Sequence, residues 1–176
     1  MGETRTLLLL RHAKSSWDDT AVEDFDRGLA PRGERAAAAV GVWLRQQGLR
    51  PDLALCSPAE RTARTLAIVL DQCARGDGST PAIRYDRELY HADGEQIAER
   101  IAEGGGAHRC VLVVGHHPGL AETALRLARG PRLPRARIEE KFPTGGLARL
   151  CFEGAWHELG PGTADIESFI VPKELM

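Results

Sequence analysis

The sequence predicts an α/β fold of three layers, with helices on both faces of a largely parallel central sheet. Short apolar runs of strand length alternate along the chain with longer segments whose apolar residues recur at helical spacing. Two of these runs, LLLL at 7–10 and CVLVV at 110–114, are unbroken, which is typical of strands buried on both faces of a parallel sheet. The 176 residues contain no internal repeat, so we expect a single domain over 1–176.

The first elements follow in order along the chain. Residues 5–11 predict a buried strand, and residues 31–47 predict a helix that ends at Gly48. The apolar stripe of that helix consists of Ala36, Val40, Trp43 and Leu44. Residues 52–56, DLALC, then predict a second short, buried strand.

The segment SPAER predicts the start of the next helix. Ser57 is expected to cap it, Pro58 suits the first helical position, and Glu60 completes an S-x-x-E capping box. Apolar residues at helical spacing continue to about Cys73, and the turn-rich loop ARGDGSTP follows.

The second half continues the alternation. We expect a weak strand at 82–85, a helix at 94–103 and a buried strand at 110–114, after which Pro118 opens another helix. The runs GLARLCF and AWHEL, separated by EG, predict an antiparallel strand pair near the C-terminus. Between them and the preceding helix, RGPRLPRARIEEK holds five basic residues and a pair of glutamates, and is interpreted as a solvated loop.

Composition narrows the classes of function. The formal net charge of −2 argues against a nucleic-acid-binding surface. No apolar run approaches the roughly 20 residues that cross a bilayer, and the leucine run is too short for a signal peptide. Four cysteines stand far apart without a CxxC pair, which favours a reduced, cytoplasmic setting.

Polar residues follow three of the predicted strands where each strand ends. Arg11 and His12 end the first strand, Arg61 follows the second, and His116 and His117 follow the strand at 110–114. Ligands of such sheets bind at the carboxyl ends of the strands. If the three strands are parallel neighbours, these side chains converge at one edge.

Two arginines with histidines suit a dianionic phosphoryl group. Guanidinium forks bind phosphate oxygens bidentately and stay charged at any working pH. A neutral histidine can attack phosphorus through a ring nitrogen, whereas a protonated one stabilises charge on the transferring oxygens. The residues alone leave both roles open for either histidine.

Three segments carry a resemblance to a known family. LLLLRHAKSSW, LCSPAERTARTL and VVGHHPGL resemble the signature segments of the histidine phosphatase superfamily, which includes phosphoglycerate mutases and acid phosphatases. DFDRGLAPRGERAA and the tail WHELGPGTADIESFIVP are similar to its small branch, which includes the SixA-type phosphohistidine phosphatases. The resemblance implies a phosphoglycerate mutase-like fold.

Position by position, the resemblance implies that His12 is the nucleophile and forms a phosphohistidine that water hydrolyses. Arg11, Arg61 and His116 would bind the phosphate, and neither a metal nor a cofactor is implied. The usual R-H-G is R-H-A here, and His117 stands where an asparagine is common, which makes it a candidate for substrate binding.

The general acid is the least defined part of the site. Glu88 lies in the region where larger members carry an acidic residue, and Asp86 and Asp93 are alternatives. A phosphoramidate leaving group is more easily protonated than an alkoxide and depends less on such an acid. The small branch lacks a large cap, which implies an open site for a phosphohistidine protein or a small phosphoester.

Other functions fit these residues less well than hydrolysis. A cysteine phosphatase needs C-x5-R, which neither Cys56 nor Cys110 satisfies. A phosphoglycerate mutase-like transferase would need longer insertions to close its site. A non-catalytic phosphate-binding module and a metal site built from four histidines are further alternatives, the latter without supporting ligand spacing. Those histidines are His12, His91, His116 and His117.

Overall fold

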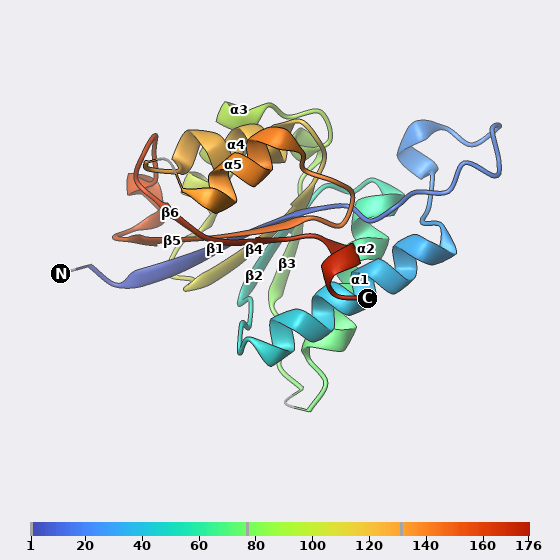
Figure 1. Cartoon of the computed structure of the whole chain (residues 1–176), viewed down its shortest axis with the longest axis horizontal. Helices are drawn as coiled ribbons and strands as arrows, with labels where there is room; N and C mark the ends of the chain where they lie inside the picture. The colour runs from blue at the N-terminus through green and yellow to red at the C-terminus, as the bar shows by residue number, and fades with distance from the viewer. Residues whose placement is uncertain (1, 77, 131) are drawn as a thin grey trace.

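A mixed β-sheet forms the middle layer of the computed structural model (Figure 1). The structure describes residues 2–76, 78–130 and 132–176; Met1, Asp77 in the predicted turn-rich loop and Pro131 in the basic segment lie outside them. Within the described residues six strands pair in the order β3-β2-β4-β1-β5-β6. They are β1 (Thr4–Arg11), β2 (Leu53–Cys56), β3 (Ala82–Tyr85), β4 (Cys110–Gly115), β5 (Leu147–Glu153) and β6 (Asp165–Ile170).

The strands that carry the predicted site are parallel neighbours, as expected. β4 lies between β1 and β2 and pairs in parallel with both, and β3 continues the parallel part beyond β2. On the other side of β1, strands β5 and β6 are antiparallel. The carboxyl ends of β1, β2 and β4 therefore open on one edge of the sheet.

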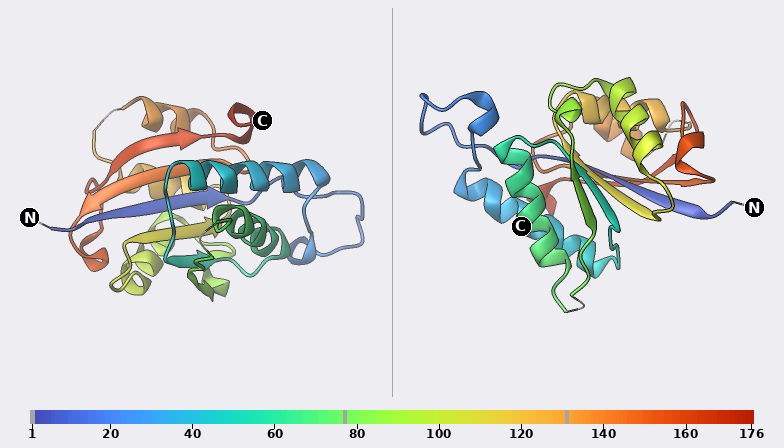
Figure 2. Two further views of the ribbon diagram at one scale, coloured as in Figure 1. Left: turned by 90° about the horizontal axis from the view of Figure 1, so that it is seen from below. Right: turned by 180° about the vertical axis from the view of Figure 1, so that it is seen from behind.

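Helices cover both faces of the sheet, which confirms the three-layer α/β fold (Figures 1 and 2). On one face lie α1 (Pro31–Gln46) and α2 (Glu60–Cys73). On the other lie α3 (Gly94–Gly104), α4 (Gly119–Leu127) and α5 (Leu133–Glu140). In the described part of the chain, none of the helices combines the length and the apolar character needed to span a membrane.

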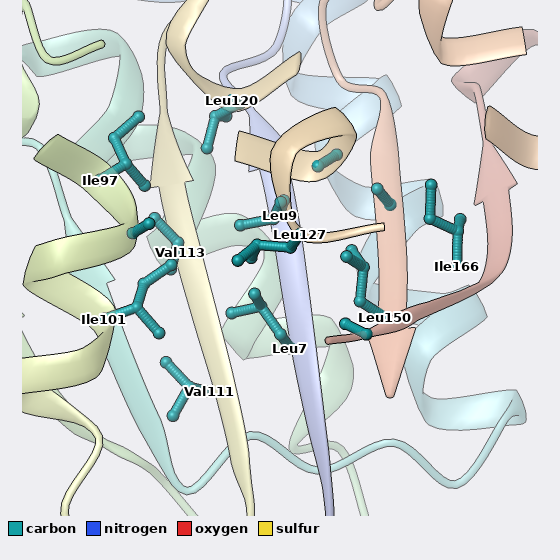
Figure 3. Close-up of a cluster of buried hydrophobic side chains, with 14 of the residues drawn as sticks. Leu7, Leu9, Ile97, Ile101, Val111, Val113, Leu120, Leu127, Leu150 and Ile166 are labelled. Carbon is teal, nitrogen blue, oxygen red and sulfur yellow. The ribbon is translucent and has the colours of Figure 1, made fainter. Parts of the chain in front are cut away.

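Strand β1 is held from both sides of the sheet. Leu7 and Leu9 pack into the core beneath α3, α4 and α5 (Figure 3), whereas Leu8 and Leu10 pack into the core beneath α1 and α2. All four side chains are fully buried. Burial of one leucine stabilises a fold by about 1.5–3 kcal/mol, so the four together fix the strand firmly. The last residue of β1 is consequently a rigid point of attachment.

The predicted strand at 155–159 is wrong. Residues Trp156–Glu158 form a short 3-10 helix, and the strand that follows β5 along the chain and pairs antiparallel with it is β6. Trp156 and Leu159 are both buried, and their separation of three residues matches a helical turn rather than the alternation of a strand. The indole Nε1 of Trp156 donates to the carbonyl of His108 at 2.6 Å, which fastens this turn against the end of α3.

The solvated loop predicted for the basic segment is also wrong in part, because Leu133–Glu140 forms helix α5. Pro134 lies in its first turn, where a missing N–H costs nothing. Arg135 and Glu139 pair at 3.1 Å with the four-residue spacing that stabilises helices. Ile138 is the one buried residue of α5, so its apolar stripe was too weak to predict it.

Candidate active site

The register of the sheet brings the two central histidines together. β1 and β4 pair with Arg11 opposite Gly115, so the next residues, His12 and His116, leave the sheet side by side. The backbone N–H of His12 donates to the carbonyl of Gly115 at 3.0 Å, and the ring centroids of the two histidines lie 5.4 Å apart. Neighbouring parallel strands thus place two imidazoles at one edge.

The hydrogen bond of the His12 ring defines its tautomer. Nδ1 lies 2.8 Å from the carbonyl oxygen of Ala13. Because a carbonyl oxygen can only accept, Nδ1 carries the proton and donates. Nε2 consequently keeps its lone pair, and it has no hydrogen-bond partner within the described residues. A buried imidazole held in this tautomer presents Nε2 as a nucleophile.

Burial keeps His12 neutral. Only 7% of the residue is exposed. Burial first, and then the positive charges of Arg61 and Arg11, lower the pKa of His12 to about 4, although its hydrogen bond to Ala13 acts in the opposite direction. At neutral pH the ring is therefore uncharged, as a nitrogen nucleophile requires.

Arg61 projects into the same place from the first turn of α2. Arg61 is buried. Its guanidinium makes two hydrogen bonds to Asp24: Nη1 donates to the backbone carbonyl at 2.7 Å, and Nη2 donates to Oδ2 at 3.1 Å. Nη2 also lies 3.4 Å from Nδ1 of His116. The fork is thereby fixed in direction before any substrate arrives.

His116 is held between Arg61 and Ser57. Since a guanidinium can only donate, Nδ1 of His116 is the acceptor, and Nε2–H donates to Oγ of Ser57 at 2.8 Å. Burial, together with the charges of His12 and Arg61, lowers the pKa of His116 to about 3. The ring is neutral here, and the arrival of a phosphate dianion would favour its protonated form.

This role of Ser57 corrects the predicted helix cap. Helix α2 begins at Glu60, after Ala59, and no side chain caps it. Oγ of Ser57 instead orients His116, although it also lies 3.4 Å from the backbone N of Ala59. The motif S-P-x-x-R is thus a positioning device for Arg61 and His116 rather than a capping box.

Arg11 is fixed from the β5 side of the sheet. Nη1 donates to the carbonyl of Phe142 at 2.8 Å, and the backbone N–H of Gly145 donates to the carbonyls of Arg11 and His12. Gly145 has φ +74°, which favours glycine at this turn. Burial and the charge of Arg61 lower the pKa of Arg11. Two guanidinium groups close enough to repel each other are well suited to share a dianion.

Sequence reasoning missed two residues of the site, Asp24 and Tyr90. The hydroxyl of Tyr90 donates to Oδ2 of Asp24, and its ring packs edge-on against His116 at 5.3 Å. Arg27 also contacts the Asp24 carboxylate, at 3.0 Å. The hydrogen bond from Tyr90, followed by Arg61, lowers the pKa of Asp24. Asp24 lies within the quoted DFDRGLAPRGERAA segment, but nothing in its spacing indicated this contact.

The three acid candidates differ in their surroundings. Asp86 pairs with Arg100 at 2.7 Å and accepts from the N–H of Glu88, while Asp93 caps α3 by accepting from the N–H of Gln96. Both carboxylates therefore have structural partners. Glu88 is exposed on the short 3-10 helix Arg87–Leu89, immediately before Leu89 and Tyr90. It stays a prediction as the acid.

His117 is the last of the predicted site residues. It is exposed, and partial burial, followed by the charge of Arg11, lowers its pKa. Over residues 2–76, 78–130 and 132–176, no group of three or more His, Cys, Asp or Glu side chains is placed to hold a metal ion. The arrangement is one of guanidinium groups around a neutral imidazole.

Comparisons with known proteins identify the family of this chain. The model of the histidine phosphatase superfamily (branch 1) matches residues 7–93. A protein of Mycobacterium tuberculosis, itself uncharacterised, is 40% identical over 167 residues, which cover 93% of this chain and 100% of the relative.

Two solved structures extend the likeness to the whole chain. One, from Nakamurella multipartitia, is assigned provisionally as the phosphohistidine phosphatase SixA; it is 34% identical, with a TM-score of 0.83 over 97% of each chain. Another, from Agrobacterium tumefaciens with the same provisional assignment, is 29% identical, with a TM-score of 0.77 over 96% of this chain and 98% of that one. On these grounds the chain belongs to the histidine phosphatase superfamily.

Proposed function

We propose that the protein is a metal-independent phosphatase that forms a phosphohistidine on His12 and passes its phosphoryl group to water. The observation that carries the proposal is the ring of His12: it is buried, neutral at neutral pH, and fixed by Ala13 with Nε2 unprotonated. Arg11, Arg61 and His116 around it supply the positive charge and the hydrogen-bond donors that a transferring phosphoryl group needs.

The reaction runs in two displacements. Nε2 of His12 attacks phosphorus, a nitrogen–phosphorus bond forms, and the bond to the leaving oxygen or nitrogen breaks with its electron pair, which takes up a proton. Water then attacks the phosphoryl group, the bond to Nε2 breaks, and its electron pair returns to the ring, while the proton that the water loses goes to the group that gave up the first proton. Arg11 and Arg61 bind the oxygens in both steps, and Glu88 is the candidate donor of the first proton.

The substrate that fits best is a phosphohistidine on a protein, followed by a small phosphoester. The two SixA-type structures described above support this order. So does the arrangement of the molecule, because the helices lie on the two faces of the sheet (Figure 2), and His12 follows β1 at the edge where the parallel strands end. A residue in a connecting segment at that edge can receive a side chain borne on another protein.

The test compares wild type, His12→Ala and the matched variant His157→Ala on a phosphohistidine peptide and on para-nitrophenyl phosphate, in excess chelator. His157 is exposed in the 3-10 helix after β5, and the last residue of β5, Glu153, pairs with Thr4 at the amino end of β1, away from His12. Phosphate release by wild type and His157→Ala alone is expected. If wild type turns over neither substrate while inorganic phosphate still raises its melting temperature, the protein is a phosphate-binding module instead.

A further inference from the structure

A second cationic region lies next to the site. A cavity of about 670 Å³ is lined by residues of α1, the end of α5, the segment before β5 and the 3-10 helix Pro172–Glu174. We call it the basic groove. The chain holds only three lysines, at 14, 141 and 173, and all three line it. The other 20 basic residues of the chain are arginines, since Lys and Arg total 23.

The cations of the basic groove are free to meet a ligand. Lys14, Lys141, Lys173 and Arg32 are exposed, and none of them has a hydrogen bond or ion pair from its side chain to another described residue. Arg137 is different, because it is bound by the carbonyl of Phe169 and the carboxylate of Glu174. Glu140 is the one acidic side chain among the lining residues.

Apolar side chains lie between these cations. Phe169 and Val171 are buried, Pro172 is half-buried, and Met176 is exposed, and all four line the basic groove. A ligand that combines negative charges with an apolar group would therefore contact both kinds of surface.

Two short connections join the basic groove to the proposed phosphate pocket, which consists of His12, Arg11, Arg61 and His116. Lys14 follows the nucleophile candidate His12 by two residues. Pro143 and Thr144 also line the groove. They lie in the chain between two residues that contact the pocket. The carbonyl of Phe142 accepts from Arg11, and the N–H of Gly145 donates to the carbonyl of His12. A polypeptide that presents a phosphorylated side chain to His12 can extend from there along this groove.

We propose that the basic groove binds an acidic segment of the substrate protein, containing Asp or Glu around an apolar residue, beside the phosphorylated side chain. This inference rests on the proposed function. A single small phosphate would be better served by buried arginine forks, as in the pocket. Exposed lysines act as separate point charges, which suit carboxylates spread along a chain.

The first experiment measures binding without catalysis. A non-phosphorylated peptide with Asp and Glu around one leucine, and its Asn/Gln counterpart, carry a neutral dye, and fluorescence anisotropy gives both dissociation constants. Wild type should bind the acidic peptide about tenfold more tightly at low salt, and the preference should shrink as salt screens the charges. Lys141→Glu with Lys173→Glu should abolish the preference.

The matched control reverses two charges elsewhere. Arg75 and Arg109 are exposed beyond the amino ends of the strands and pair only with Asp71 and Glu3 in the described part of the chain. Arg75→Glu with Arg109→Glu should keep the preference within about twofold, as exposed ion pairs contribute little. An equal loss in both double variants, or no preference in wild type, overturns the proposal.

Lysine chemistry gives an independent readout, because every lysine of the chain lines the groove. A carbodiimide should couple the acidic peptide to Lys14, Lys141 or Lys173, located by mass spectrometry, and the Asn/Gln peptide should not couple. Acetylation, which removes the charge, should abolish binding, whereas dimethylation, which keeps it, should not.

Turnover separates this proposal from the proposed function. With phosphohistidine versions of the two peptides, the ratio of kcat/KM for acidic over neutral should fall about tenfold in the Lys141→Glu, Lys173→Glu variant. If wild type releases phosphate from both peptides at equal rates, the groove proposal fails and the phosphatase stands. If the acidic peptide binds in the groove but neither is hydrolysed, the phosphatase fails and the groove stands.

Discussion

The proposed phosphate pocket and the basic groove lie side by side, yet they use positive charge in opposite ways. In the pocket, Arg11 is half-buried and Arg61 is buried. A backbone carbonyl fixes the direction of the Arg11 side chain, and a backbone carbonyl and a carboxylate fix that of Arg61. In the groove, Lys14, Lys141 and Lys173 are exposed on flexible stems, without side-chain partners within the described residues.

The difference indicates what each region is built for. Fixed forks around a neutral imidazole hold one geometry, and transfer of a phosphoryl group depends on such positioning. Mobile ammonium groups on a surface hold no geometry, but they attract and orient an acidic partner. Changes in the pocket should therefore alter the chemical step, and changes in the groove should alter the choice of partner.

The largest effect is expected for Arg61→Lys. The ammonium keeps the charge but loses the fork that contacts Asp24 and lies beside His116. The kcat for para-nitrophenyl phosphate should fall by about 10²–10³, the loss typical of removing one stabilising donor.

Its control is Arg64→Lys on the same helix. Arg64 is exposed and pairs with Glu34 at 3.2 Å, so the same chemical change there should leave kcat within about twofold. Equal activity of Arg61→Lys and Arg64→Lys would remove the distinction between fixed and mobile cations.

The pocket should also determine how stability depends on acid. The pKa values of His12 and His116 fall from 6.5 to about 4 and about 3. The unfolded chain therefore binds more protons than the folded one in this range, and the free energy of unfolding should decrease as pH falls from 6.5 towards 4. The expected loss is a few kcal/mol in phosphate-free buffer, measured by urea unfolding.

His116→Asn isolates the contribution of the pocket. Its unfolding free energy should change less between pH 6.5 and 4 than that of wild type, whereas His157→Asn, at an exposed position, should keep the full dependence. Identical pH profiles for all three proteins would show that the pocket histidines are not held neutral.

A smaller effect is expected for Glu88→Gln. If Glu88 donates the proton to the leaving group, kcat for para-nitrophenyl phosphate should fall about tenfold or more, and kcat for a phosphohistidine peptide should fall less, because its nitrogen is protonated more easily. Glu99→Gln, an exposed position on α3, is the control. If kcat does not fall more for para-nitrophenyl phosphate than for the phosphohistidine peptide, a group other than Glu88 is the acid.

The smallest effect is expected for chelator. Excess EDTA should leave the rate of phosphate release unchanged, since both steps are carried by His12 and its cationic neighbours. The measurement is a rate before and after dialysis against chelator, with a magnesium-dependent phosphatase as a positive control. Loss of activity that is restored by a divalent ion would contradict the metal-independent mechanism.

The sequence predicted the parallel half of the molecule better than the antiparallel half. Unbroken apolar runs identified β1 and β4. Because ligands bind at the carboxyl ends of parallel strands, the sequence also predicted that His12 and His116 lie at one edge of the sheet, and the pairing of β1 with β4 confirms it. Helix α5 and the 3-10 turn at Trp156 were not predicted, because each has few buried residues and therefore only a weak apolar pattern. Asp24 and Tyr90 meet through a long-range contact that no local spacing encodes.

The account depends most directly on His12 as the phosphorylated residue. Wild type mixed rapidly with para-nitrophenyl phosphate, quenched in alkali and digested should yield a phosphorylated peptide that contains His12, identified by mass spectrometry. Lys141→Glu with Lys173→Glu should yield the same peptide, and His12→Ala should yield none. A phosphoryl group on His116 or His117, or turnover by His12→Ala at the wild-type rate, would contradict the central claim.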